Sequence, residues 1–359
     1  FYCVKLFLRM LESKLQKQII ISTCYLVLSA ILFSCSSPKQ VESDNYFITE
    51  TRCHITPIKD QGNSETCWIY AMLSTIESNR IAMGDSVNIS PVYFERMLLQ
   101  EEAEGVYMRK GGGEISMRGM IPHCMTLFDK YGAFAYDSYR SRSENKNMSV
   151  LAREVKLLAK NDAARCVGLD KMRSDALELL DREIAFLPRF QFFCGSEYTP
   201  QQFGRSVVQP EDYEYLGADY PFPDRRITDV IRATPPDSLL LIAQHSLEQG
   251  KAVCWEGDIS EEGFDWNNGV ADLSQKELKK IKSLSAEDLR EKYRHDIETF
   301  RTTDDHAMSL CGISHDKHGR KYFICKNSWG TSNRFKGLMF MSFEYFLCKT
   351  VLIASLNTK

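Results

Sequence analysis

The order of two residue patterns along the chain constrains its fold most strongly. Of the 359 residues, those from 66 to 140 repeat apolar side chains at helical spacing. Those from 251 to 356 form short apolar runs, rich in aromatic and β-branched residues and separated by turn residues. Because helices come first and strands follow, the sequence predicts an α+β fold with two lobes. Between them, residues 141–235 carry charged helical segments and a Pro- and Tyr-rich stretch, which we interpret as a helical insertion.

Start and stop residues give the expected bounds of the elements. Ser90 is an expected N-cap and Pro91 the first helical residue, whereas Gly84 and Gly105 are expected helix ends. The expected helices span residues 66–84, 90–105, 117–130 and 274–300. The expected strands lie within 251–259, 307–314, 321–329, 337–343 and 349–356.

The N-terminal segment reads as an export signal. Lys14 and Lys17 precede an uncharged, mostly apolar run over residues 19–34, which is too short and wrongly flanked for a transmembrane helix. The motif LFSC, ending at Cys35, resembles the bacterial lipobox, in which the cysteine is lipidated. The resemblance implies an exported lipoprotein, anchored to the bacterial cell envelope in the periplasm or at the outer membrane; a plain cleaved signal or an uncleaved anchor is the alternative. We expect a signal peptide over 1–35, a polar tether over 36–52 and one domain over 53–359, with a helical lobe (53–140), the insertion (141–235) and a β lobe (236–359).

Charge and cysteine content argue against several kinds of partner. The chain has 45 Lys and Arg against 48 Asp and Glu, so its charge gives no reason to expect binding to nucleic acid. Its 12 cysteines include no CxxC pair and no compact Cys/His cluster, so we predict no metal site. We also expect no cofactor, and contact with a membrane only through the lipid anchor.

Cys67 is the candidate nucleophile. It lies at the start of the first expected helix, where backbone N–H groups and the helix dipole stabilise a thiolate. Of the seven histidines, only His306 stands directly before an expected strand in the motif DDHAM, and Asn327 follows on the next strand in KNSWG. A base held by a third polar group is the arrangement that nucleophilic catalysis needs. For an isolated Cys-Trp pair, simple packing is the alternative interpretation.

These motifs resemble those of papain-like cysteine peptidases. QGNSETCW matches the family's Gln-x5-Cys-Trp, DDHAM its Asp-His-Ala segment and KNSWG its Asn-Ser-Trp-Gly. The resemblance implies a Cys67 nucleophile, a His306 general base and acid, and Asn327 orienting the imidazole. It also implies Gln61 as a donor to the oxyanion, Trp329 as a cover over the Asn–His hydrogen bond, and substrate contacts by Trp68, Asp305, Gly112 and Gly113.

Spacing and two substitutions refine the resemblance. His306 comes 239 positions after Cys67, more than the roughly 130–150 typical of papain and the cathepsins. Together with Ser64, where secreted papains carry a disulfide cysteine, this resembles the bleomycin hydrolase and aminopeptidase C branch, whose members act on peptides and assemble into hexamers. Aminopeptidase and endopeptidase modes both stay open. Glu65 stands where the family favours glycine, so the alternative is a catalytically silent papain-fold protein that binds peptides or a partner.

Overall fold

The computed structural model describes residues 46–142, 147–218 and 230–357. The compact unit that carries the candidate residues is Ile48–Lys359. The expected signal peptide, the lipidation site Cys35 and most of the tether lie outside the described residues and stay predictions. The end of the expected tether is not a free linker, since it forms strand β1 (Phe47–Arg52). Among the helices of the described part, none is long and apolar enough to cross a membrane.

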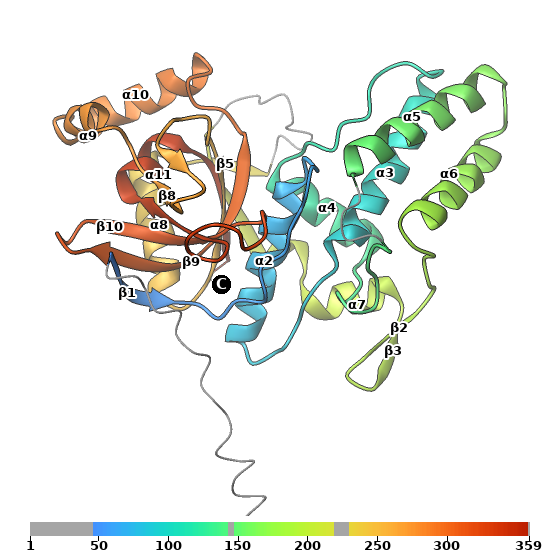
Figure 1. The fold of residues 1–359 in the computed structure, drawn as a ribbon, viewed down its shortest axis with the longest axis horizontal. Coiled ribbons are helices and arrows are strands. Elements are labelled where there is room, and N and C mark those ends of the chain that lie inside the picture. The colour runs from blue at the N-terminus through green and yellow to red at the C-terminus, as the bar shows by residue number, and fades with distance from the viewer. Residues whose placement is uncertain (1–45, 143–146, 219–229, 358–359) are drawn as a thin grey trace, which may run out of the picture. The chain divides into compact units, whose positions relative to one another are not determined.

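Helices form one side of this unit (Figure 1). In α3, the Ser90 hydroxyl accepts the Tyr93 N–H at 3.3 Å, as expected for an N-cap, although the helix continues past Gly105 to Met108. The sequence placed the start of the next helix at residue 117, but the structure has it at Ile121. The helices of this side are α2 (Cys67–Ala82), α3 (Pro91–Met108), α4 (Ile121–Tyr131), α5 (Met148–Ala164), α6 (Leu169–Glu183) and α7 (Pro200–Val207).

Helix α2 lies between the other helices and the sheet (Figure 1). Every side chain from Trp68 to Asn79 is buried, which explains why the helix is not amphipathic. The Thr75 hydroxyl donates to Ser309 Oγ on β9 at 2.8 Å, which fixes the helix against that strand. Cys67, the first residue of α2, therefore lies half-buried where the helices meet the sheet.

The main sheet of the described residues is largely antiparallel. Its strands follow the order β5-β4-β12-β6-β9-β10-β11-β8-β7, and β1 pairs with β9. Gly257 on β6 lies opposite His306 on β9, and Glu256 lies opposite Ala307. The strands are β4 (Tyr213–Gly217), β5 (Ile231–Ala233), β6 (Val253–Gly257), β7 (Phe264–Asp265), β8 (Val270–Ala271), β9 (His306–Asp316), β10 (Lys321–Lys326), β11 (Leu338–Ser342) and β12 (Thr350–Leu356). A separate hairpin joins β2 (Gln191–Phe193) to β3 (Ser196–Tyr198).

Two local expectations differ from the structure. The range assigned to the helical insertion, 141–235, also contains β4 and β5, which belong to the main sheet. The helical stretch expected over 274–300 forms two helices, α9 (Gln275–Lys282) and α10 (Ala286–Glu298). The chain breaks there because Ser285 caps α10, its hydroxyl accepting the Asp288 N–H at 3.1 Å. Two further helices, α8 (Pro236–Glu248) and α11 (Phe343–Lys349), pack against strands of the main sheet.

Candidate active site

A chain of buried hydrogen bonds shapes the loop that leads to Cys67. The Ser64 hydroxyl donates to Gln61 O at 2.8 Å and lies 2.6 Å from the Thr66 hydroxyl. The Thr66 hydroxyl in turn donates to Glu95 Oε1 on α3 at 2.6 Å. These buried hydrogen bonds fix the turn before α2, which places Cys67 at the first position of the helix.

His306 and Asn327 come together at adjacent strand ends. His306 opens β9, and Asn327 directly follows β10, its antiparallel neighbour. The His306 Nε2 and Asn327 Oδ1 atoms are 2.8 Å apart, and the Ser328 N–H donates to the same oxygen at 2.7 Å. Since an amide oxygen only accepts, Nε2 carries the hydrogen and Nδ1 is the basic nitrogen.

Aromatic rings cover this pair. The Trp329 ring centroid is 4.6 Å from that of His306. Phe264 and Trp266 pack edge-on against Trp329, with centroid separations of 5.8 Å and 5.3 Å. His306 is only 3% exposed and Asn327 2%. The histidine–amide hydrogen bond is therefore kept from water, the role that the sequence assigned to Trp329.

Gln61 links the Cys67 loop to the end of β10. Its Oε1 accepts the Ser328 hydroxyl at 2.6 Å, and its backbone N–H donates to Ser328 O at 2.8 Å. Its Nε2 donates to Ser64 O at 2.7 Å. The side-chain amide is thus fixed in orientation beside the start of α2.

One cavity of about 300 Å³ brings these groups together, because Cys67, His306, Gln61 and Trp329 all line it. Asp305 and Trp68, both expected at the substrate-binding site, line it as well. Asn327 lies behind His306, to which it is hydrogen-bonded. The candidate catalytic residues therefore lie together at this cavity, although they come from distant parts of the sequence.

Burial favours the neutral form of both reactive groups. It raises the pKa of the Cys67 thiol to about 12, and the nearby Glu256 carboxylate raises it further, against the lowering effect of backbone N–H groups and Arg118. Burial likewise lowers the pKa of His306 to about 4, although its bond to Asn327 works in the opposite direction. The sequence predicted a thiolate stabilised by the helix N-terminus. In the structure the burial of the Cys67 thiol opposes the stabilising effect of the helix terminus on a thiolate.

At this site the structure differs from three predictions made from the sequence. Gly112 and Gly113 are exposed in the loop after α3, beside Arg109, and do not line the cavity. Gly119 lines it instead. A Cβ atom at Gly119 would stand 2.8 Å from the Trp68 ring, whose Nε1 donates to Met117 O at 3.1 Å. Residues 117–120 therefore pack on Trp68 as a wall of the cavity and do not join the helix.

The acidic residue that affects Cys67 is also a different one. Glu65, the substitution noted in the sequence, lines the cavity with an exposed side chain. Glu256 is 2% exposed, and its Oε2 accepts the Ile121 N–H at 3.1 Å. A carboxylate within the otherwise apolar run of β6 is the sequence signal that could have identified it.

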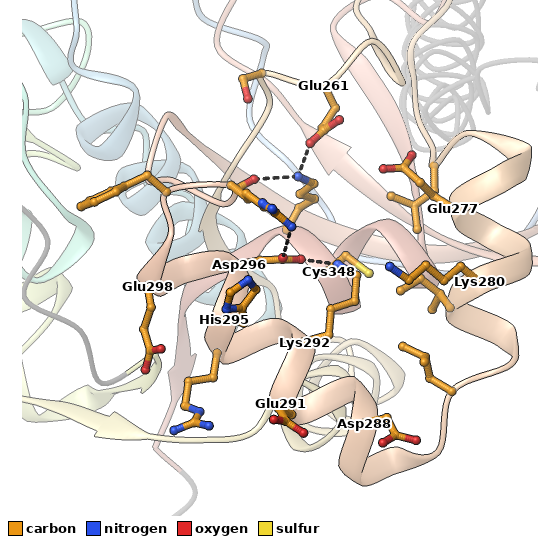
Figure 2. Close-up of a pocket in the computed structure, with 18 residues that line it drawn as sticks. Glu261, Glu277, Lys280, Asp288, Glu291, Lys292, His295, Asp296, Glu298 and Cys348 are labelled. Atoms are coloured by element: carbon orange, nitrogen blue, oxygen red, sulfur yellow. Dashed lines mark hydrogen bonds and ion pairs between the residues drawn. The ribbon is translucent and has the colours of Figure 1, made fainter.

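A larger cavity, of about 810 Å³, lies by α9 and α10 and holds none of the candidate catalytic residues (Figure 2). Two ion pairs lie among its charged side chains: Lys292 with Asp296, and Lys349 with Glu261. We place the candidate active site in the smaller cavity because the reactive groups lie there.

Comparisons with known proteins bear on the family and the fold of the chain. Residues 230–351 match the model of the Peptidase C1-like family. No curated protein matches the chain. Among solved structures, PepW from Lactobacillus rhamnosis HN001 is similar, with a TM-score of 0.64 and 16% identity over 88% of this chain and 83% of PepW.

Two plant and animal structures also match. Bromelain protease from Ananas comosus, solved with the E64 inhibitor, has a TM-score of 0.38 and 14% identity over 84% of this chain and 94% of its own. Procathepsin L 3 from the larval midgut of Tenebrio molitor has a TM-score of 0.42 and 12% identity over 90% and 72%. The predicted α+β, two-lobe architecture is confirmed, and the chain has the fold of the papain-like cysteine peptidases.

Proposed function

We propose that this protein is a cysteine peptidase that hydrolyses peptide bonds through Cys67, His306 and Asn327. The observation that carries the proposal is the shielded 2.8 Å hydrogen bond between His306 Nε2 and Asn327 Oδ1, which leaves Nδ1 as a base in the cavity that Cys67 lines. The family match supports the histidine and asparagine, which lie within residues 230–351. Cys67 lies outside that match, so its role rests on the geometry.

In the proposed mechanism, acylation begins with the thiol of Cys67 and the neutral imidazole of His306. As the Cys67 sulfur attacks the substrate carbonyl, its proton passes to His306 Nδ1, and the resulting imidazolium is held by Asn327. The tetrahedral oxyanion takes hydrogen bonds from the Gln61 side-chain amide and the Cys67 backbone N–H. His306 then gives the proton to the leaving amine, the C–N bond breaks, and a thioester remains on Cys67.

Deacylation reverses these roles. His306 takes a proton from water while the oxygen attacks the thioester carbonyl. The C–S bond breaks, the proton returns to the sulfur, and the carboxylic acid leaves with the thiol of Cys67 restored. No group is oxidised or reduced in either step.

Labelling with a peptidyl chloromethyl ketone, mapped by mass spectrometry, tests the proposal. The reagent is directed by peptide binding, so it should alkylate Cys67 before the exposed thiols of Cys166 and Cys194. Cys67→Ala should lower peptide hydrolysis by at least about 10³-fold. Cys166→Ser is the matched control and should keep both labelling and hydrolysis. Hydrolysis that survives in Cys67→Ala would contradict the proposal.

A second candidate function has its own observation. Burial and Glu256 both raise the Cys67 pKa, which disfavours a standing thiolate. A papain-fold protein that binds peptides without cleaving them fits this electrostatic setting. Digestion of a peptide library, with cleavage sites mapped by mass spectrometry, separates the two: turnover excludes the silent protein, and the cleavage positions distinguish aminopeptidase from endopeptidase action. Peptide binding without turnover would establish the silent protein.

A further inference from the structure

Glu95 on α3 is a buried carboxyl group that the proposed mechanism does not use. Its side chain is 1% exposed, and its Oε1 is 2.6 Å from the hydroxyl of Thr66, the residue directly before Cys67. It lines a cavity of about 660 Å³ that shares Gln61 with the cavity holding Cys67. A titratable group therefore lies behind the loop that carries the proposed oxyanion donor.

Three short contacts between oxygen atoms join Glu95 to the backbone of Gln61. Thr66 Oγ1 is 2.6 Å from Glu95 Oε1 and 2.6 Å from Ser64 Oγ. Ser64 Oγ is 2.8 Å from Gln61 O. Each contact needs one hydrogen, and the two hydroxyls supply two, whereas a carboxylate and a carbonyl oxygen supply none. All three contacts become hydrogen bonds only when Glu95 carries a proton.

The surroundings of Glu95 place its protonation equilibrium near neutral pH. Burial raises its pKa to about 7, against the lowering effect of hydrogen bonds from the Thr66 and Ser64 hydroxyls. Arg96, the next residue on α3, binds Asp181 at 2.6 Å. Both states of the carboxyl group are therefore populated around pH 7, and the ionised state attracts the hydrogens of the two hydroxyls.

The charged neighbours across the cavity have carboxylates of their own. The titratable or charged side chains that line it with Glu95 are Lys59, Asp60, Tyr70, Tyr136, Tyr139 and Arg140, and the start of α5 adds the uncharged Asn147 and Met148. Lys59 binds Glu77 at 2.6 Å. Arg140 pairs with Asp137. Burial and the two hydroxyl partners therefore govern the protonation of Glu95.

The protonation state of Glu95 decides where the Ser64 hydrogen goes. When Glu95 is ionised, Thr66 donates to it, and the Ser64 hydrogen can serve either Thr66 or Gln61 O, but not both. When Glu95 is protonated, it donates to Thr66, Thr66 donates to Ser64, and Ser64 donates to Gln61 O. The same turn fixes the Gln61 side chain, whose Nε2 donates to Ser64 O at 2.7 Å.

We propose that Glu95 is a positioning residue for peptide hydrolysis, and that its protonated form orders the turn that holds the Gln61 amide for the oxyanion. The inference rests on the proposed peptidase function and adds a means of regulating it by pH. The oxyanion develops in the transition state, so protonation of Glu95 should raise kcat and leave KM nearly unchanged.

Steady-state kinetics on a fluorogenic peptide between pH 5.5 and 8.5 tests the proposal. We expect kcat of the wild type to fall about three- to tenfold from pH 6 to pH 8, the effect of one buried hydrogen bond, with KM within about twofold. Glu95→Gln offers an amide N–H to Thr66 at every pH, so its kcat at pH 8 should stay within about twofold of its value at pH 6. A fall in Glu95→Gln equal to that of the wild type would overturn the proposal.

Two further variants separate this effect from other titrations. Glu154→Gln makes the same charge change on the exposed surface of α5 and should keep the fall of the wild type. Ser64→Ala removes the hydroxyl that reaches Gln61 O, so its kcat should be low at both pH values, even if Glu95→Gln fails to fold. If Ser64→Ala keeps the pH dependence of the wild type, the inference is wrong.

Hydrogen exchange measures the order of the turn without turnover. The Ser64 N–H donates to Gln61 O at 3.3 Å, and after correction for the intrinsic rate it should be more protected at pH 6 than at pH 8 in the wild type and equally protected in Glu95→Gln. Absence of hydrolysis, combined with this difference in protection, would count against the peptidase alone. Hydrolysis with equal protection at both pH values in the wild type would count against the inference alone.

Discussion

The cavity by α9 and α10 and the smaller cavity that holds Cys67 contain similar residues in different arrangements. The larger one is lined by Cys348, His295 and several carboxylates, and the smaller one by Cys67, His306 and its own carboxylates. In the larger cavity a charged side chain meets its opposite, as Lys292 meets Asp296 (Figure 2). In the smaller one the histidine is bound by a neutral amide. Neither volume nor residue type therefore marks the reactive site.

Thiol acidity does not distinguish the cavities either. Burial raises the pKa of Cys348 to about 11, much as it raises that of Cys67 to about 12. The histidines differ, because His306 is 3% exposed and fixed by one hydrogen bond, whereas His295 is exposed on α10. A buried, oriented imidazole can exchange a proton with a neighbouring thiol, and its neutral partner leaves it free to do so. The comparison therefore rests on the burial of His306 and on its polar partner, Asn327.

The largest expected effect comes from removing that partner. Asn327→Ala should lower kcat by on the order of 10²–10³-fold, because the imidazole loses its orientation. KM should change little, because Asn327 does not bind the substrate. Asp296→Ala breaks the ion pair of the larger cavity and should leave kcat and KM within about twofold of wild type. Steady-state kinetics on a fluorogenic peptide measures both. Equal effects of the two variants would remove the distinction between the cavities.

The second prediction concerns acid stability. The pKa of His306 lies at about 4 in the folded protein, below its ordinary value of 6.5, because burial disfavours the imidazolium. Its neutral form therefore contributes stability that is fully present above about pH 6.5 and is lost as the pH falls to 4, because only the unfolded chain readily takes the proton. The loss amounts to about 3 kcal/mol. Urea unfolding at pH 7 and pH 4 measures it.

Matched histidine variants isolate this contribution. In His306→Gln, the difference in unfolding free energy between the two pH values should shrink by up to about 3 kcal/mol. In His295→Gln it should stay as in the wild type, since that ring is exposed. If His306→Gln keeps the full acid sensitivity, the burial of His306 does not lower the free energy of unfolding at pH 4, and other groups account for acid unfolding.

Much of the fold is predictable because local patterns agree with tertiary packing. The strand-like runs of the second half form β6 and β9–β12, and the helical stretch at Thr66 becomes α2. The motif residues Gln61, Cys67, His306 and Asn327 also meet in space. Periodicity and turn residues act over a few positions, so they give elements and order. They do not say that β4, far earlier in the chain, pairs with β12.

The rest of the site depends on contacts between segments distant in sequence. The helix expected from residue 117 begins at Ile121, because Met117 O bonds to the Trp68 ring and the Ile121 N–H bonds to Glu256. Both partners belong to other elements, so helical periodicity gives no hint of them. The same contacts explain why Gly119 lines the cavity, whereas the family resemblance implied Gly112 and Gly113.

The smallest expected effect tests how rigidly the wall at Gly119 is built. Gly119→Ala places a methyl group 2.8 Å from the Trp68 ring, which is itself stacked on His123 at 5.0 Å, so the loop has to shift. We expect a loss of about 1–3 kcal/mol in the free energy of unfolding and slower peptide hydrolysis. Gly168→Ala, which meets nothing within 4 Å, and Lys280→Ala, in the wall of the larger cavity, should each stay within about 0.5 kcal/mol of wild type. Urea denaturation compares the three variants. If Gly119→Ala unfolds at the same urea concentration as these controls, the wall of the smaller cavity is as adaptable as that of the larger one.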